Sequence, residues 1–241
     1  YDKAYSAYAV GGAEAAVNML NRNLDLNIQD YVSVNFLAVA DVVDLLGGID
    51  LDLTDEEVVH MNNYCVETSE ITGKKYKKIE PEVAGTYHLN GVSYSRIRYT
   101  EGGDFQRTSR QRLVIEKIAE KAKKADLSTI NKIIDAVFPE ITTSFTSGEI
   151  VKMSAGLLQY SIGDNEGFPM DNETPDSIPG YQGSYVVPKG LEENVIKLHK
   201  FLFPDEDYTP TDTVKEISDH IKNVTGIYPD DSEDSTEDNG E

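Results

Sequence analysis

The sequence predicts a layered α/β (α+β) domain in which a central mixed β-sheet is flanked by helices. Apolar and polar residues alternate at 31–36 and again at 49–53, which is the pattern of half-buried strands. Segments with helical spacing of apolar residues follow, and the longest, Asp104–Ala125, has a continuous apolar stripe. Strands that alternate with helices in this way are typical of layered domains.

Each predicted element has a local signal. Small and apolar residues recur at helical spacing over Ala13–Asn21, and the helix expected at Leu37–Leu46 is stopped by Gly47-Gly48. Residues 54–85 are polar and rich in lysine, so we expect an excursion from the core there. The remaining expected elements are strands at Tyr94–Tyr99 and Ser184–Val187 and helices at Thr129–Val137, Ser147–Gln159 and Leu191–Phe203.

The 241 residues are interpreted as a single domain over residues 1–204, because no linker interrupts the pattern before Pro204. Residues 205–241 are expected to form a C-terminal extension. It ends in Pro229–Glu241, which has seven acidic residues and no lysine or arginine, and we predict a disordered tail there. The chain begins at Tyr1 without an initiator Met, a signal peptide or an anchor, and we interpret it as a trimmed or processed form.

The composition excludes several classes of function. A formal net charge of -21 argues against nucleic acid as a partner, because phosphate backbones need a positive surface. The single cysteine, Cys65, excludes an internal disulfide framework and a cysteine-based zinc site. The four histidines lack the spacing of metal ligands. No apolar run approaches the roughly 20 residues that a membrane span needs.

One segment departs from this acidity, because Ser93–Lys124 contains nine lysines and arginines against four acidic residues. Arg96 and Arg98 are two residues apart on the expected strand at 94–99, so both side chains are expected to leave the same face. Guanidinium groups placed side by side suit a phosphate or a carboxylate.

The start of the following helix extends this positive segment. Asp104 occupies the expected N-cap position, and Arg107, Arg110 and Gln111 fall on one face of the first two turns. Helix N-termini attract anions through their free N–H groups and the macrodipole. An anion site is one interpretation. The alternative is that the arginines pair with acidic residues, where exposed pairs contribute about 0–1 kcal/mol each.

The run from Arg96 to Gln111 resembles the most diagnostic segment of the LytR-CpsA-Psr family. Other segments agree with it in order: Asp2–Gly12 resembles the family's lysine-containing stretch that ends in paired glycines, Tyr31–Phe36 and Asp41–Ile49 resemble the strand and helix that follow, His88–Gly91 stands at the family's Leu-Asn/Asp-Gly turn, and Tyr185–Pro188 with its helix fits the domain end. The resemblance covers residues 1 to about 203.

This resemblance implies a membrane-anchored enzyme at the extracellular face of the bacterial cytoplasmic membrane, as in Gram-positive cell envelopes. It implies transfer of a glycopolymer, such as teichoic acid or capsule, from a polyprenyl-pyrophosphate carrier to peptidoglycan, assisted by Mg²⁺ whose ligands stay unassigned. By the same resemblance, the pyrophosphate-binding residues are Arg96, Arg98, Arg107, Arg110 and Gln111, with Lys3 as a weaker candidate; the catalytic residues are Arg96, Arg98 and Asp104, and Asp104 and Arg110 order the site.

An alternative from a different class is a non-catalytic protein that binds polyprenyl-pyrophosphate glycans during cell-envelope assembly. The family's N-terminal part has no counterpart before Tyr1. That part supplies early core strands, a further arginine and the carboxylates credited with Mg²⁺. We therefore expect the anchor to be absent here, and we hypothesise that residues 1–241 alone are not a competent transferase.

Overall fold

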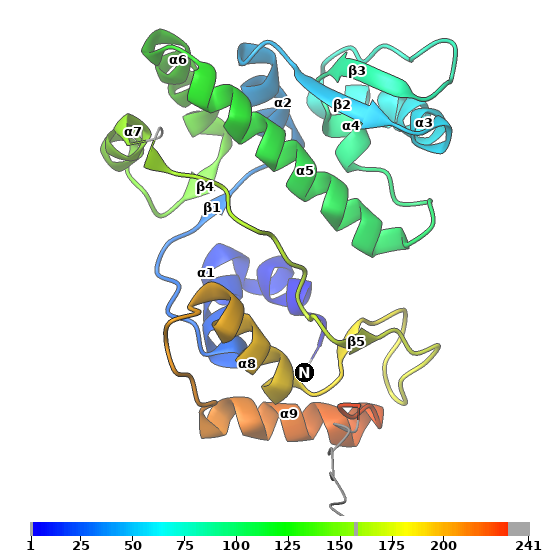
Figure 1. The fold of residues 1–241 in the computed structure, drawn as a ribbon, viewed down its shortest axis with the longest axis vertical. Coiled ribbons are helices and arrows are strands. Elements are labelled where there is room, and N and C mark those ends of the chain that lie inside the picture. The colour runs from blue at the N-terminus through cyan, green and yellow to red at the C-terminus, as the bar shows by residue number, and fades with distance from the viewer. Residues whose placement is uncertain (1, 157–158, 231–241) are drawn as a thin grey trace, which may run out of the picture. The chain divides into compact units, whose positions relative to one another are not determined.

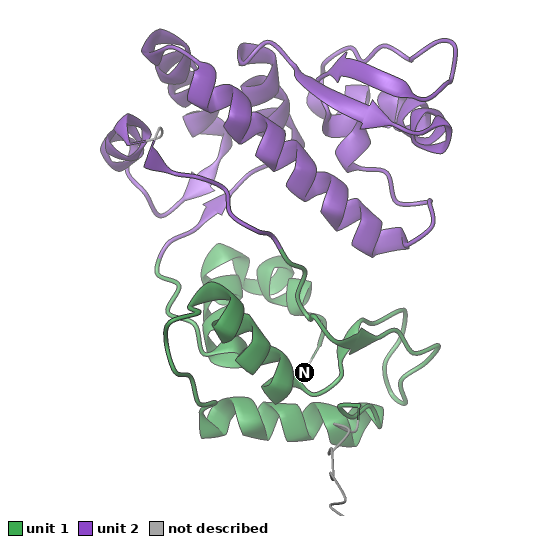
Figure 2. Cartoon of the chain, viewed as in Figure 1, with its two compact units in different colours: residues 1–29, 166–241 green, residues 30–165 purple. Residues whose placement is uncertain are grey.

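A computed structural model describes residues 2–156 and 159–230, and within them the predicted mixed α/β class is confirmed (Figure 1). The chain divides into two compact units, residues 1–29 with 166–241 (unit 1) and residues 30–165 (unit 2), shown in Figure 2. Unit 2 contains β1 (Val32–Ser33), α2 (Phe36–Leu45), β2 (Ile49–Leu53), α3 (Asp55–Thr72), β3 (Gly85–Leu89), α4 (Val92–Ser95), α5 (Gly103–Lys124), α6 (Leu127–Val137), the 3₁₀ turn η1 (Phe138–Glu140), β4 (Thr142–Thr143) and α7 (Ser147–Ala155). Unit 1 contains α1 (Ala4–Leu24), β5 (Asn172–Glu173), β6 (Val187–Pro188), α8 (Leu191–Leu202) and α9 (Asp212–Thr225).

The strands of the described residues form three small antiparallel sheets, β1 with β4, β2 with β3 and β5 with β6. The expected central mixed sheet is not found among these residues. One reason is that the strand expected at 31–36 is cut short, because Asn35 caps α2 by accepting a hydrogen bond from the Ala38 N–H at 2.7 Å. The strand at 49–53 is confirmed, with every second residue buried.

The core of unit 2 forms where β2 packs against helices. Ile49, Leu51 and Leu53 turn their side chains to one face of the β2–β3 hairpin. They meet apolar residues of α2, α3, α4 and α5, namely Val43, Val58, Met61, Tyr94 and Val114. In Figure 1 the long α5 (green) runs across this unit next to the hairpin. Burying each such side chain contributes roughly 1.5–3 kcal/mol to stability.

The excursion expected at residues 54–85 was wrong for its first half. This segment begins with α3, whose residues Val58, Met61 and Cys65 are buried in the core. Thr54 and Glu57 form a capping box at the start of this helix, and Gly73, with φ 68°, ends it in the left-handed conformation. The polar composition misled the prediction, because one apolar stripe is sufficient to bury a helix.

Unit 1 is built around α1, α8 and α9. Leu24, Leu191, Val195, Val214 and Ile217 form its main buried cluster. Helix α9 lies inside the predicted extension 205–241, yet it packs against α8, so the structure differs from the expected boundary at 204. The physical reason is an apolar stripe on α9 that needs a partner face. Residues 231–241 of the predicted acidic tail lie outside the described residues.

Among the described residues, no helix combines the length and the apolar character needed to span a membrane.

Candidate anion-binding site

Arg96 and Arg98 lie directly after the short helix α4, in turns where a strand was expected. The backbone N–H groups of Ser95, Arg96 and Ile97 donate to carbonyl groups three or four residues earlier. The strand predicted at Tyr94–Tyr99 is therefore wrong, and Arg96 and Arg98 do not share a strand face. Alternation in this segment resembled a strand, but Ser93, Tyr94 and Ser95 are all buried, which a one-sided strand does not allow.

Arg98 and Arg107 converge on one carboxylate. Nη2 of Arg98 lies 2.8 Å from Oδ2 of Asp104, and Nη2 of Arg107 lies 3.2 Å from Oδ1. All three side chains remain partly exposed, so solvent and solutes reach them. The Nε of Arg107 is buried and has no hydrogen-bond partner. Two guanidinium groups therefore meet at the position of one anion, the Asp104 carboxylate.

The first turn of α5 reinforces this geometry. Gly102 and Gly103 both have positive φ, at 83° and 49°, and Gly102 rather than Asp104 is the N-cap. A Cβ on Gly102 would lie 2.5 Å from the side chain of Gln106. No side chain caps this helix; the N–H groups of Gly103 and Phe105 donate instead to the carbonyls of Thr100 and Gly102, at 3.0 and 3.1 Å. The predicted N-cap role of Asp104 is wrong, although the residue does lie in the first turn.

Arg96 takes a different position, held between helices. Its guanidinium lies 2.7 Å from Glu67 and donates to the Thr68 hydroxyl at 3.2 Å. It also lies over the rings of Phe36 and Tyr64, at 5.0 and 5.5 Å from their centroids. Only 10% of the side chain is exposed, so Arg96 fixes α3 and α4 together and has less freedom to meet a ligand than Arg98.

Arg110 is buried and its three nitrogen atoms are all engaged. Nε lies 2.8 Å from Oε1 of Glu57, Nη1 donates to the Ile97 carbonyl, and Nη2 donates to the Thr100 hydroxyl. Burial next to this pair raises the pKa of Tyr94 to about 12, with the Glu57 charge acting in the same direction. Arg110 thus joins three parts of unit 2, namely α3, the segment between α4 and α5, and α5 itself.

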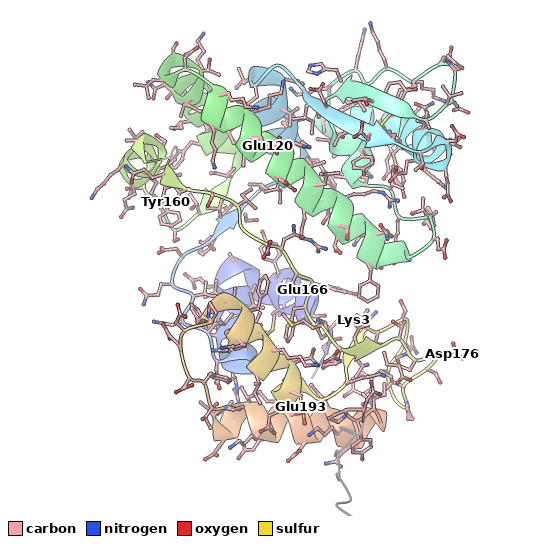
Figure 3. The ribbon with its side chains drawn as sticks, in the orientation of Figure 1. Lys3, Glu120, Tyr160, Glu166, Asp176 and Glu193 are labelled. Atoms are coloured by element: carbon pink, nitrogen blue, oxygen red, sulfur yellow. The ribbon has the colours of Figure 1, made fainter. Side chains whose placement is uncertain are left out.

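Gln111 and Lys3 are the remaining predicted site residues. The Gln111 side chain donates to the Ser95 carbonyl at 3.5 Å, on the side of α5 that faces α4. Lys3 belongs to unit 1, as its label in Figure 3 indicates. Its ammonium lies 4.5 Å from the centroid of the Tyr185 ring. The structure therefore brings Arg96, Arg98, Asp104, Arg107, Arg110 and Gln111 into one region of unit 2, and Lys3 into the other unit.

The sequence of this region matches a known protein family. The profile of the LytR_cpsA_psr family matches residues 1–184, which include all seven predicted site residues. The chain belongs to this family. The LytR_cpsA_psr assignment agrees with the order of the paired glycines at 11–12, the Leu-Asn-Gly turn at 89–91 and the arginine segment at 96–111.

Curated relatives share this similarity over most of the chain. Biofilm regulatory protein A of Streptococcus mutans is 34% identical over 169 residues, which are 67% of this chain and 38% of that protein. The polyisoprenyl-teichoic acid–peptidoglycan teichoic acid transferase TagV of Bacillus subtilis is 28% identical over 223 residues, covering 86% of this chain and 51% of TagV. The chain spans about half, or less, of the length of the curated relatives it matches.

Solved structures of similar fold agree. A protein described as a transcriptional regulator from Enterococcus faecalis superimposes with a TM-score of 0.66 at 26% identity, covering 95% of this chain and 79% of that one. TagU of B. subtilis superimposes with a TM-score of 0.53 at 23% identity, covering 87% and 79%. The second comparison supports the LytR_cpsA_psr fold alone.

Sequence reasoning missed the acidic and aromatic partners of the family's arginines. Glu57, Glu67 and Thr68 all lie on α3, the helix that was not predicted. The signal that could have located them is Thr54-x-x-Glu57, a capping-box pattern at the start of a helix.

The predicted Mg²⁺ would need a group of metal-ligating side chains. Among the described residues there is no group of three or more Asp, Glu, His or Cys side chains that could hold a metal ion. The carboxylates nearest the arginines, Glu57, Glu67 and Asp104, are each engaged by a guanidinium. These residues do not form a Mg²⁺ site by themselves.

Proposed function

We propose that this chain binds the pyrophosphate of a polyprenyl-linked glycopolymer and belongs to a transferase that attaches the glycopolymer to peptidoglycan. The observation that carries the proposal is the convergence of Arg98 and Arg107 on Asp104, beside the uncapped start of α5. The relatives named as teichoic acid transferases support the same substrate class.

The chemistry of such a transfer matches what these side chains supply. An acceptor hydroxyl attacks a phosphorus atom of the pyrophosphate, a phosphodiester forms, the bridging P–O bond breaks, and the polyprenyl monophosphate leaves. Phosphoryl transfer depends mainly on positioning and on neutralising phosphate charge. Arg98 and Arg107 provide both, while Arg96 and Arg110 hold the surrounding helices in position.

An incoming pyrophosphate must compete with Asp104 for the two arginines. Because Arg98 and Arg107 are partly exposed, exchange of one anion for another costs little, at roughly 0–1 kcal/mol per exposed pair. The buried Nε of Arg107 gains an acceptor when a phosphate oxygen arrives. Asp104 is then released next to the reacting phosphate, and we assign it the role of accepting the proton of the acceptor hydroxyl.

Two further properties belong to this proposal. Because peptidoglycan is the acceptor, we propose that the enzyme acts at the extracellular face of the bacterial cytoplasmic membrane and is membrane-anchored. Mg²⁺ is proposed to assist the reaction. Its ligands would be phosphate oxygens and carboxylates other than those of Glu57, Glu67 and Asp104, since Mg²⁺ often takes only one or two carboxylates in addition to phosphates and water.

The decisive experiment combines a polyprenyl-pyrophosphate glycan, peptidoglycan oligosaccharides and Mg²⁺ with the chain extended to the length of its relatives. Arg98→Ala and Arg107→Ala are compared with Lys124→Ala, which removes an exposed charge far along α5. Loss of one charge-assisted phosphate contact should reduce transfer roughly ten- to a hundredfold. Tight carrier binding without any linked product would identify a non-catalytic binding protein instead. Unchanged transfer by both arginine variants would refute the site.

A further inference from the structure

A cavity lies in unit 2, and none of the predicted arginines lines it. Its volume is about 190 Å³, many times the roughly 15 Å³ that a single water needs. It is formed by α3, the loop that follows α3, and the turn from β3 into α4. Its lining residues are Met61, Cys65, Lys75, Tyr76, Lys77, His88, Leu89, Asn90, Gly91, Ser93 and Tyr94.

The hydroxyl of Ser93 is the first indication that this cavity takes a ligand. Ser93 is 4% exposed, and its Oγ is buried without a hydrogen-bond partner. Its polar neighbour is the Cys65 thiol, whose pKa is raised by burial and only partly lowered by Ser93. A thiol is a weak acceptor for a hydroxyl, so Ser93 can turn its O–H to a stronger acceptor in the cavity.

The charge at the cavity is the second indication. Lys75 and Lys77 both line it, and neither has an ion-pair partner within the part of the chain that the structure describes. Their neighbour Lys74 differs, because it pairs with Asp41 at 2.7 Å and with Asp44. On a chain of net charge -21, two unneutralised lysines beside one cavity favour an anion.

We propose that this cavity binds a small organic phosphate. The phosphate would lie between Lys75 and Lys77 and accept a hydrogen bond from Ser93, since lysine binds phosphate as a point charge. The apolar part of the ligand would cover Met61, Leu89 and Tyr94. Asn90 contributes shape rather than donors, because its amide already donates to the Ala40 carbonyl and to Asp44.

This site is distinct from the arginine site, although both use α3 and α4. Arg96 contacts Tyr64, Glu67 and Thr68 on α3, whereas the cavity is lined by Met61 and Cys65 of that helix. Tyr94 lines the cavity and also lies beside Arg110, but none of the predicted anion-binding residues lines the cavity. The inference therefore does not depend on the proposed transferase activity, and it can be tested without it.

Cys65 provides a reporter, because it is the only cysteine of the chain and lines the cavity. The rate of its alkylation by iodoacetamide, which carries no charge, is measured during titration with inorganic phosphate and with phenyl phosphate. Sodium chloride of equal ionic strength is the control. We expect saturable protection by both phosphates, with phenyl phosphate effective at lower concentration because its ring meets the apolar wall.

Three variants separate this cavity from other anion sites. Lys75→Gln/Lys77→Gln should weaken protection roughly tenfold, as expected for two exposed charge pairs. Lys124→Gln/Lys152→Gln makes the same charge change at exposed positions elsewhere in unit 2 and should leave protection unchanged. Arg98→Ala should also leave it unchanged. Equal protection in the cavity-lysine variant and the wild type would overturn the proposal, since phosphate would then act at another site.

The amide NMR shifts of Gly91 and Ser93 provide a second measurement that does not require Cys65 to react. Saturable shifts at these two residues, lost in Lys75→Gln/Lys77→Gln, would support the site. An absence of saturable shifts and of protection by either phosphate, or the same effect from sodium chloride, would show that the cavity binds no phosphate.

Discussion

The guanidinium of Arg110 on α5 lies 2.8 Å from the carboxylate of Glu57 on α3, and both side chains are largely buried, at 7% and 14% exposure. Glu57 also closes the capping box of α3, because its carboxylate accepts from the Thr54 N–H at 3.0 Å. One ion pair therefore fixes the start of α3 to the helix that carries the predicted anion site. The position of that site depends on a contact that does not touch the anion.

We expect Arg110→Ala to destabilise unit 2 strongly. Removing one partner of a buried pair leaves an uncompensated charge, which costs about 3–5 kcal/mol. Urea unfolding should show this loss for Arg110→Ala and a change below about 0.5 kcal/mol for Lys124→Ala on the same helix. A loss under about 1 kcal/mol for Arg110→Ala would mean that the pair does not hold α3 and α5 together.

Asp104→Asn should strengthen the binding of inorganic pyrophosphate. The carboxylate competes for Arg98 and Arg107, and exposed pairs of this kind contribute about 0.2–1 kcal/mol each, so removing both should raise affinity up to roughly thirtyfold. Isothermal titration calorimetry measures the change. Glu101→Gln, at an exposed neighbouring position, is the matched control. Weaker binding by Asp104→Asn would show that the carboxylate organises the arginines instead of competing with the ligand.

The pH dependence of stability should report on His88. Its ring nitrogens lie 2.6 Å from Asp50 and 2.5 Å from the Gly47 carbonyl, and both acceptors favour the protonated ring. The hydrogen bond to Asp50 raises the pKa of His88 above its usual 6.5, with Lys121 opposing the shift. The same bond lowers the pKa of Asp50 below its usual 3.8.

The sign of the effect follows from these two shifts. The contribution of His88 is complete below about pH 6.5 and is lost as the pH rises through its raised folded-state pKa. The contribution of Asp50 is present above about pH 4 and is lost on acidification. We expect the stability difference between the wild type and His88→Gln to be largest at pH 4–6.5 and to shrink at higher pH. Asp50→Asn should abolish this trend, and a difference independent of pH would contradict the pairing.

Asn194 should be the most sensitive polar residue of unit 1. It is fully buried, accepts from the Asp171 N–H at 2.9 Å, and donates to the carbonyls of Asp171, Lys189 and Gly190. Substitution by Ala removes this partner from the Asp171 N–H and the Lys189 carbonyl, whereas the carbonyls of Asp171 and Gly190 keep the N–H groups of Lys189 and residue 194 as donors. Each buried group that stays unsatisfied costs about 1–3 kcal/mol. Thermal unfolding should therefore shift downward by several degrees more for Asn194→Ala than for Asn23→Ala, whose amide makes a single bond within α1.

Several elements were predictable because their signals are local. The stripe of α5, the Gly47-Gly48 stop after α2 and the alternation of β2 depend only on neighbours within one or two turns. The strand predicted at 94–99 failed because alternation over six residues does not show whether both faces are buried. Helix α3 was missed because its capping box was overlooked within a polar, lysine-rich segment.

The sequence by itself determined the family, the mixed α/β class and the identity of the charged residues near α5. Those features are set by residue types and their spacing along the chain. The tertiary structure decided which arginines are free: Arg98 and Arg107 stay exposed beside Asp104, whereas Arg96 and Arg110 are buried against α3. The reason is that the partners of the buried pair, Glu57 and Glu67, are distant in sequence and meet the arginines only when α3 packs into the core.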